Sequence, residues 1–122
     1  MLLGNSIKKV FVSGGAGFIG SHVVDILMSQ GYQVTVYDDL SNGRKVFIEQ
    51  HLNKKNFNFF EANILDVDTL KEAMKGHDLV WHLAANTDII GGYDKPRRDL
   101  MDCVVGTFNI LESMRFLNIK PI

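Results

Sequence analysis

The chain has 122 residues, and its composition of 46% hydrophobic and 22% charged residues is typical of one globular domain. Its 13 basic and 14 acidic residues are mixed along the sequence and give a formal net charge of -1, so no basic stripe indicates a nucleic-acid partner. No apolar run approaches the roughly 20 residues of a membrane helix, and the single cysteine excludes an internal disulfide. We therefore expect a cytoplasmic protein that binds neither nucleic acid nor membrane.

The first half of the chain predicts a strand, a helix, a second strand and a second helix. A β-branched and aromatic run at 8–13 is typical of a strand buried on both faces. Helical spacing of apolar residues predicts a helix over 18–30, and the residues with this spacing are Ile19, Val23, Ile26 and Leu27. Residues 32–39 predict the next strand, and residues 41–52 predict a loop that leads into a helix.

The second half repeats this alternation. Residues 56–63 predict a third strand, and residues 66–76 predict a helix that either Asp66 or Asp68 caps. Residues 77–85 form a very apolar run that predicts a fourth strand.

A long helix over 97–118 is expected last, after a loop rich in glycine and charge. Its apolar positions are Leu100, Val104, Phe108, Leu111 and Phe116. Strands that alternate with helices require crossover connections, so the sequence predicts an α/β fold with a doubly wound parallel sheet. No linker or composition shift divides it.

Glycines gather between the first strand and the first helix, in the sequence GGAGFIG. Gly14 suits a tight turn, Gly17 allows a ligand to approach the backbone, and Gly20 allows close packing of helix and strand. The amides and dipole at the start of that helix favour a pyrophosphate. Asp38 ends the next strand about 20 residues later, where a dinucleotide site places the acceptor for the ribose hydroxyls. Its charge favours NAD over NADP.

The same residues allow structural alternatives. A glycine-rich loop can serve tight packing alone, and Asp38 can belong to a solvated turn. Ser13 and Ser21 flank the glycines and suit either phosphate binding or helix capping. Arg44 and Lys45 lie near enough in sequence to Asp38 to reduce its preference for NAD. The four histidines share no metal-ligand spacing, so we expect no metal site, and His82 is interpreted as a structural residue.

Four segments in order, GGAGFIG, VYDDLSNGR, FEANILD and HLAAN, resemble the extended short-chain dehydrogenase/reductase family, in particular its nucleotide-sugar epimerase/dehydratase branch. The resemblance covers residues 1–122 as the N-terminal part of such a protein. It implies a Rossmann-type sheet in the order 3-2-1-4, NAD as cofactor and a nucleotide-sugar as partner of the longer protein. We also expect a homo-oligomer, because the fourth strand leaves an unpaired outer edge.

The resemblance implies cofactor-binding residues in four segments. The glycine turn contributes Gly14, Gly17, Phe18, Ile19 and Gly20. The adenosine half is bordered by Asp38, Asp39, Asn42, Gly43, Asn63 and Ile64. The nicotinamide ribose lies against Leu83, Ala84, Ala85 and Thr87.

Three features depart from the family pattern. Asn63 stands where the family usually has an aspartate that touches the adenine amino group, although an amide oxygen also accepts. Cys103 replaces an asparagine of the long helix. No Tyr-x-x-x-Lys occurs, because the residues four positions after the tyrosines are Val36, Ser41 and Arg97.

Catalytic residues are therefore expected to be absent from this chain. The sequence favours the NAD-binding portion of a nucleotide-sugar epimerase/dehydratase that is inactive alone. Two alternatives remain, a non-enzymatic NAD(P)-binding sensor or regulatory module and an NADP-dependent reductase of the same family.

Overall fold

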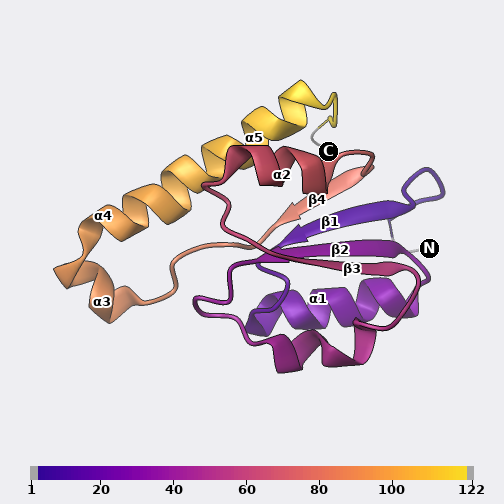
Figure 1. Ribbon diagram of the computed structural model, residues 1–122, viewed down its shortest axis with the longest axis horizontal. Coiled ribbons are helices and arrows are strands. Elements are labelled where there is room, and N and C mark those ends of the chain that lie inside the picture. The colour runs from indigo at the N-terminus through magenta and orange to yellow at the C-terminus, as the bar shows by residue number, and fades with distance from the viewer. Residues whose placement is uncertain (1–2, 121–122) are drawn as a thin grey trace.

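Four parallel strands form a single sheet at the centre of the computed structural model, which describes residues 3–120 (Figure 1). The strands are β1 (Lys9–Ser13), β2 (Gln33–Asp38), β3 (Phe57–Glu61) and β4 (Leu79–His82). Their spatial order is β3-β2-β1-β4, which confirms the predicted α/β class and strand order.

The strand register brings the carboxyl ends of three strands together. Ser13 at the end of β1 pairs with Tyr37 in β2 and with His82 in β4. The chain continues this alignment past the strands, because the Gly14 amide donates to the Tyr37 carbonyl at 2.9 Å and the Leu83 amide donates to the Ser13 carbonyl at 3.0 Å. The glycine turn, Asp38 and the residues after β4 therefore meet at one edge of the sheet.

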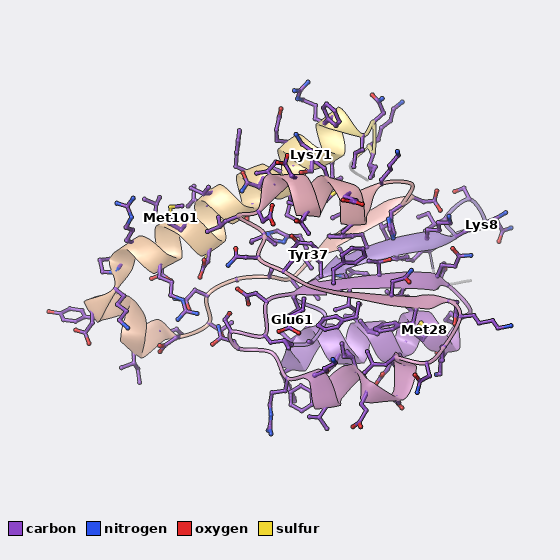
Figure 2. All side chains as sticks on the ribbon, in the orientation of Figure 1. Lys8, Met28, Tyr37, Glu61, Lys71 and Met101 are labelled. Atoms are coloured by element: carbon purple, nitrogen blue, oxygen red, sulfur yellow. The ribbon has the colours of Figure 1, made fainter. Side chains whose placement is uncertain are left out.

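Helices cover both faces of the sheet (Figure 1). The helices are α1 (Phe18–Ser29), η1 (Lys45–His51), α2 (Val67–Met74), α3 (Ile89–Asp94), α4 (Pro96–Asp99), η2 (Leu100–Val105) and α5 (Gly106–Phe116). Of these, α1 and η1 lie on one face and α2 and α5 on the other, whereas α3 and α4 lie beyond the end of the sheet (Figure 1). Met28 belongs to the core on the α1 side and Tyr37 to the core on the α2 and α5 side (Figure 2). Two apolar layers thus hold the sheet, as the predicted crossovers require. Within residues 3–120, none of the helices has the length and apolar character that spanning a membrane requires.

The buried face of α1 differs from the predicted stripe. Ile19 and Ile26 are 66% and 52% exposed, and the buried residues of the helix are Gly20, Ser21, Val24, Leu27 and Met28. A Cβ atom at Gly20 would overlap the carbonyl oxygen of Gly14. The buried face of the helix therefore begins at Gly20, beside the turn, and continues through Val24, Leu27 and Met28.

Three predicted segments differ in detail. The helix before β3 is the 3-10 helix η1, in which the buried residues Ile48 and His51 are three positions apart, the period of that helix. The expected loop before the long helix contains α3, which begins where the Asp88 carboxylate accepts from the Gly91 amide at 2.9 Å. The predicted long helix is present as an unbroken helical run over residues 96–116, in which the π-helical turn η2 lies between α4 and α5.

Candidate functional site

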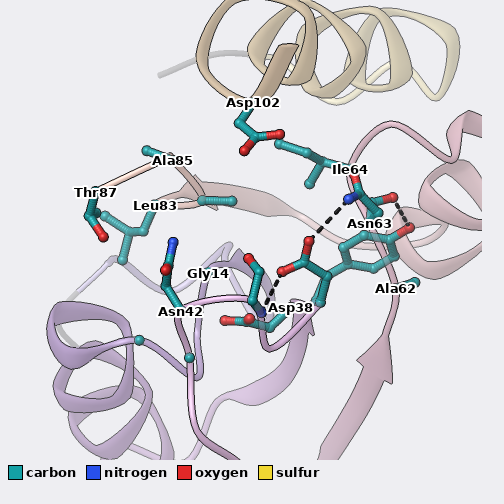
Figure 3. A pocket seen from close by; sticks show the side chains of 16 residues that line it. Gly14, Asp38, Asn42, Ala62, Asn63, Ile64, Leu83, Ala85, Thr87 and Asp102 are labelled. Atoms are coloured by element: carbon teal, nitrogen blue, oxygen red, sulfur yellow. Dashed lines mark hydrogen bonds between the residues drawn. The ribbon is translucent and has the colours of Figure 1, made fainter. Parts of the chain in front are cut away.

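A pocket opens at the edge of the sheet where the strands end (Figure 3). Its lining includes twelve positions that the resemblance implied, namely Gly14, Gly17, Asp38, Asp39, Asn42, Gly43, Asn63, Ile64, Leu83, Ala84, Ala85 and Thr87. Phe18, Ile19 and Gly20 are not among the lining residues, and the side chains of Phe18 and Ile19 are exposed at the start of α1. Segments far apart in sequence therefore share one cavity.

Two glycines of the turn are required by the fold itself. Gly14 has a φ of 72°, and a Cβ atom there would lie 2.7 Å from the Ala84 nitrogen. Gly20 has no room for a Cβ beside the Gly14 carbonyl. The predicted tight turn at Gly14 is present, and both glycines allow backbone segments to approach one another.

Gly17 differs from these two glycines. Its φ of -79° suits any residue, and the one protein atom near a Cβ added at this position would be the Gly14 oxygen at 3.3 Å. Gly17 is also the N-cap of α1, and no side chain caps this helix within the described residues. The pocket therefore has space beside the N-terminus of α1, a position at which a helix dipole favours an anion.

The Asp38 carboxylate also lines the pocket and is bonded to the glycine turn. It is 8% exposed, its Oδ2 accepts from the Ala16 amide at 2.9 Å and its Oδ1 accepts from the Leu40 amide at 2.9 Å. Burial raises the pKa of Asp38 above its usual value, and the two amide bonds oppose that rise. Because each carboxylate oxygen accepts more than one hydrogen bond, Asp38 keeps acceptor positions for hydroxyl groups.

Gly43 leaves room for that carboxylate. A Cβ atom at Gly43 would lie 2.9 Å from Asp38 Oδ1 and 3.0 Å from the Ala16 carbonyl oxygen. The Arg44 amide donates to the same Ala16 oxygen at 2.9 Å, so the loop after β2 is fastened to the glycine turn. The two halves of the predicted dinucleotide motif are therefore in direct contact.

A model of the NAD-dependent epimerase/dehydratase family matches residues 10–122. The chain belongs to this family. It is 36% identical to the UDP-glucose 4-epimerase of Mycolicibacterium smegmatis, over 93% of this chain and 37% of that protein. It is 35% identical to UDP-glucuronic acid decarboxylase 4 of Arabidopsis thaliana, over 89% of this chain and 24% of that protein.

Solved structures agree with this assignment. The UDP-Glc/GlcNAc 4-epimerase of Campylobacter jejuni superposes with a TM-score of 0.83 at 30% identity, over 92% of this chain and 35% of that one. The UDP-glucose 4-epimerase of Thermus thermophilus, solved in complex with NAD, gives 0.81 at 31% identity, with the same coverage. This epimerase/dehydratase family chain thus spans between 24% and 37% of the length of these relatives. NAD is the cofactor of the family.

Tyr37 lines the pocket of this family member, but its surroundings do not suit proton transfer. Its hydroxyl donates to the Asn63 carbonyl at 2.9 Å. Burial is the larger cause and the negative charge of Asp66 the smaller one of a rise in the pKa of Tyr37 to about 12. The buried Tyr37 therefore joins β2 to the segment after β3 through its hydroxyl, which is a structural role.

Sequence reasoning did not select four lining residues, which are Tyr37, Ser41, Ala62 and Asp102. Tyr37, Ser41 and Ala62 each precede a predicted site residue in the sequence, and this adjacency is the only sequence feature that could have indicated them. Asp102 reaches the pocket from η2, where Arg98 Nε donates to its carboxylate at 3.3 Å. The position of Asp102 in the pocket depends on how the chain runs between β4 and η2, which the residues around Asp102 do not predict.

Ser13 and His82 belong to a hydrogen-bonded chain behind the pocket. Ser13 Oγ accepts from the Leu83 amide at 3.2 Å and lies 2.6 Å from His82 Nδ1. His82 Nε2 lies 2.9 Å from Thr107 Oγ1, so both ring nitrogens have partners. Ser21 Oγ donates to the Phe18 carbonyl at 3.1 Å, and neither serine caps α1. Ser13 thus fixes the end of β4 instead of offering its hydroxyl to a phosphate.

Acid is expected to destabilise the fold through two histidines. Burial lowers the pKa of His82 and of His77 below the usual value of 6.5, so both resist protonation in the folded state. Unfolded chains bind these protons as the pH falls below about 6.5, and this shifts the equilibrium towards unfolding. We expect the urea concentration at the unfolding midpoint to decrease as the pH is lowered from 7.5 to 5, and to decrease less in His82→Gln than in wild type. An equal decrease in the two proteins would contradict a buried neutral His82.

Proposed function

We propose that this chain is the NAD-binding portion of a nucleotide-sugar epimerase or dehydratase similar to UDP-glucose 4-epimerase. The observation that carries the proposal is the pairing of Gly17, at the uncapped start of α1, with the Asp38 carboxylate in one pocket. The start of α1 at Gly17 suits a pyrophosphate, and the Asp38 carboxylate suits the hydroxyls of a ribose. An adenine dinucleotide carries both groups. The family match supports this choice of ligand.

The remaining lining residues support a defined direction for NAD. The adenosine half would lie by the loop after β2 and by Asn63 and Ile64 after β3. The nicotinamide half would lie along residues 83–85 and Thr87, which leave the sheet beside the glycine turn. The small side chains of Ala84 and Ala85 leave space for a ring or ribose at this end.

Catalysis is proposed to require residues outside this chain. Bound NAD would supply a hydride acceptor for oxidation of a sugar carbon, as in relatives that act on UDP-sugars by name. The present residues bind and orient the cofactor, while none of the tyrosines has a lysine four positions later. We therefore propose that the chain alone binds NAD and is inactive, and that a nucleotide-sugar is the substrate of the longer protein.

Calorimetric titration tests the proposal directly. We expect NAD to bind at least tenfold more tightly than NADP, because the Asp38 charge repels a 2′-phosphate. Absence of heat and of a thermal shift with either dinucleotide would refute the binding function. Preference for NADP would instead favour a reductase of the same family. NAD binding by a protein whose full length lacks Tyr-x-x-x-Lys would favour a regulatory module.

Self-association is proposed to use α5 and the segment before it. Large apolar side chains are exposed along one stripe, which consists of Leu100, Val104, Phe108 and Leu111. Val104 and Phe108 are 60% and 62% exposed, and β4 beside this stripe is an edge strand of the described sheet. Exposed apolar patches of this kind typically mark interfaces.

A charge on the stripe should dissociate the proposed oligomer. We expect Phe108→Glu to raise the apparent dissociation constant by at least tenfold, because an unpaired carboxylate resists burial. Sedimentation equilibrium measures the change, and Ile26→Glu on the exposed face of α1 is the matched control. A wild-type chain that is monomeric at high concentration would contradict the proposal.

A further inference from the structure

Asn63, at the rim of the pocket just after β3, is held by hydrogen bonds from both of its side-chain polar atoms. Its Nδ2 donates to Asp39 Oδ2 at 3.0 Å, and its Oδ1 accepts from the Leu65 amide at 2.8 Å. The Tyr37 hydroxyl also donates to the backbone carbonyl of Asn63 (Figure 3). Although Asn63 is exposed at the rim, its side chain and its backbone are both hydrogen-bonded to residues beside the cavity.

These partners determine which way the amide group points. A carboxylate only accepts hydrogen bonds and a backbone amide only donates, so Nδ2 must face Asp39 and Oδ1 must face Leu65. Rotating the amide by half a turn would lose both bonds and place its oxygen against the Asp39 carboxylate. Asp39 is itself held in place, because its Oδ1 accepts from the Ser41 amide at 2.9 Å.

The fixed amide retains one donor and one acceptor position. Nδ2 carries a second N–H, and Oδ1 carries a second lone pair. Adenine offers an amino donor beside a ring-nitrogen acceptor, which matches this pair in a single orientation. Hypoxanthine offers a carbonyl acceptor beside a ring N–H donor, which is the reverse pattern. An amide that could turn freely would match either base.

We propose that Asp39 is a positioning residue that orients Asn63 and thereby makes the pocket select adenine over hypoxanthine in its dinucleotide. This inference rests on the proposed function, since it concerns the base of the bound cofactor. It also gives a physical reason for an amide at position 63. A carboxylate there would face the Asp39 carboxylate at hydrogen-bonding distance, and two like charges so close repel each other.

Paired titrations with NAD and nicotinamide hypoxanthine dinucleotide test the inference. We expect wild type to bind NAD about tenfold more tightly, because the reversed pattern leaves a donor and an acceptor unmatched. Asp39→Ala should reduce this ratio to about threefold or less, since only the Leu65 amide then opposes rotation of the Asn63 amide. Asn63→Leu should bring it close to one. Asp68→Asn removes an exposed carboxylate that does not line the pocket and should keep the wild-type ratio.

The ratio separates orientation from a merely structural role, because loss of stability weakens both dinucleotides alike. An unchanged ratio in Asp39→Ala would overturn the role of Asp39, and an unchanged ratio in Asn63→Leu would show that Asn63 does not read the base. Equal affinities in wild type would overturn the inference while leaving NAD binding intact. Failure of wild type to bind either dinucleotide would instead refute the proposed function on which the inference rests.

Discussion

Gly14→Ala is expected to lower the free energy of unfolding by about 3 kcal/mol, from roughly 1–2 kcal/mol for a left-handed conformation and a similar amount for overpacking. Gly14 has a φ of 72°, and its new Cβ would lie 2.7 Å from both the Ala84 nitrogen and the Leu83 carbonyl carbon. Backbone atoms of another strand end cannot move aside as a side chain can. Chemical denaturation measures the loss.

Gly76→Ala is the matched control for this substitution. Gly76 has a similar φ of 77°, but no atom lies within 4 Å of the position that its new Cβ would take. We expect this variant to lose about 1 kcal/mol, which is the conformational part alone. Equal losses for the two variants would show that the contact between the glycine turn and the end of β4 does not limit residue size.

Asp38→Asn is expected to weaken NAD binding by about 30-fold, equivalent to about 2 kcal/mol for charged hydrogen bonds to ribose. The carboxylate accepts from the Ala16 and Leu40 amides with different oxygens, whereas an amide would place an NH₂ group against one of these donors. The same variant should lose the discrimination against NADP because the negative charge is gone. Titrations with NAD and NADP measure both effects.

Asp68→Asn serves as the control for charge removal here as well, since Asp68 is exposed and does not line the pocket. An Asp38→Asn variant that binds NAD as tightly as wild type, while its stability is unchanged, would contradict the assignment of the ribose to Asp38. A loss of stability without a loss of affinity would leave Asp38 with the structural role of joining two loops.

The glycine turn and the place of Asp38 at the end of β2 were predictable because residue types and their spacing along the chain indicate them. Strand, turn and helix follow one another within residues 9–29, and the turn angle at Gly14 is a property of the backbone at that position. Asp66 as the cap of α2 was also within reach, since its carboxylate accepts from the Thr69 amide three positions later. The parallel order of the strands follows from the alternation of elements.

Other features of the pocket depend on contacts across the sheet. Asp102 and the Asp39–Asn63 hydrogen bond join segments that only the strand pairing brings together. The buried face of α1 was predicted wrongly in part, because the approach of Gly20 to Gly14 outweighs the apolar stripe that contains Ile19 and Ile26. Periodicity measures apolar spacing and contains no information about backbone contact.

The sequence by itself determined the α/β class, the glycine turn and the acidic end of β2, because each depends on backbone angles and spacing within a few residues. Only the tertiary structure decided that Asn63 points its amide at Asp39 and that Ser13 bonds His82. Hydrogen bonds between distant residues depend on strand register and on the position of each loop. A register shift of one residue would turn the side chain of His82 to the opposite face of the sheet and displace the loop that carries Asn63, so local patterns cannot specify these contacts.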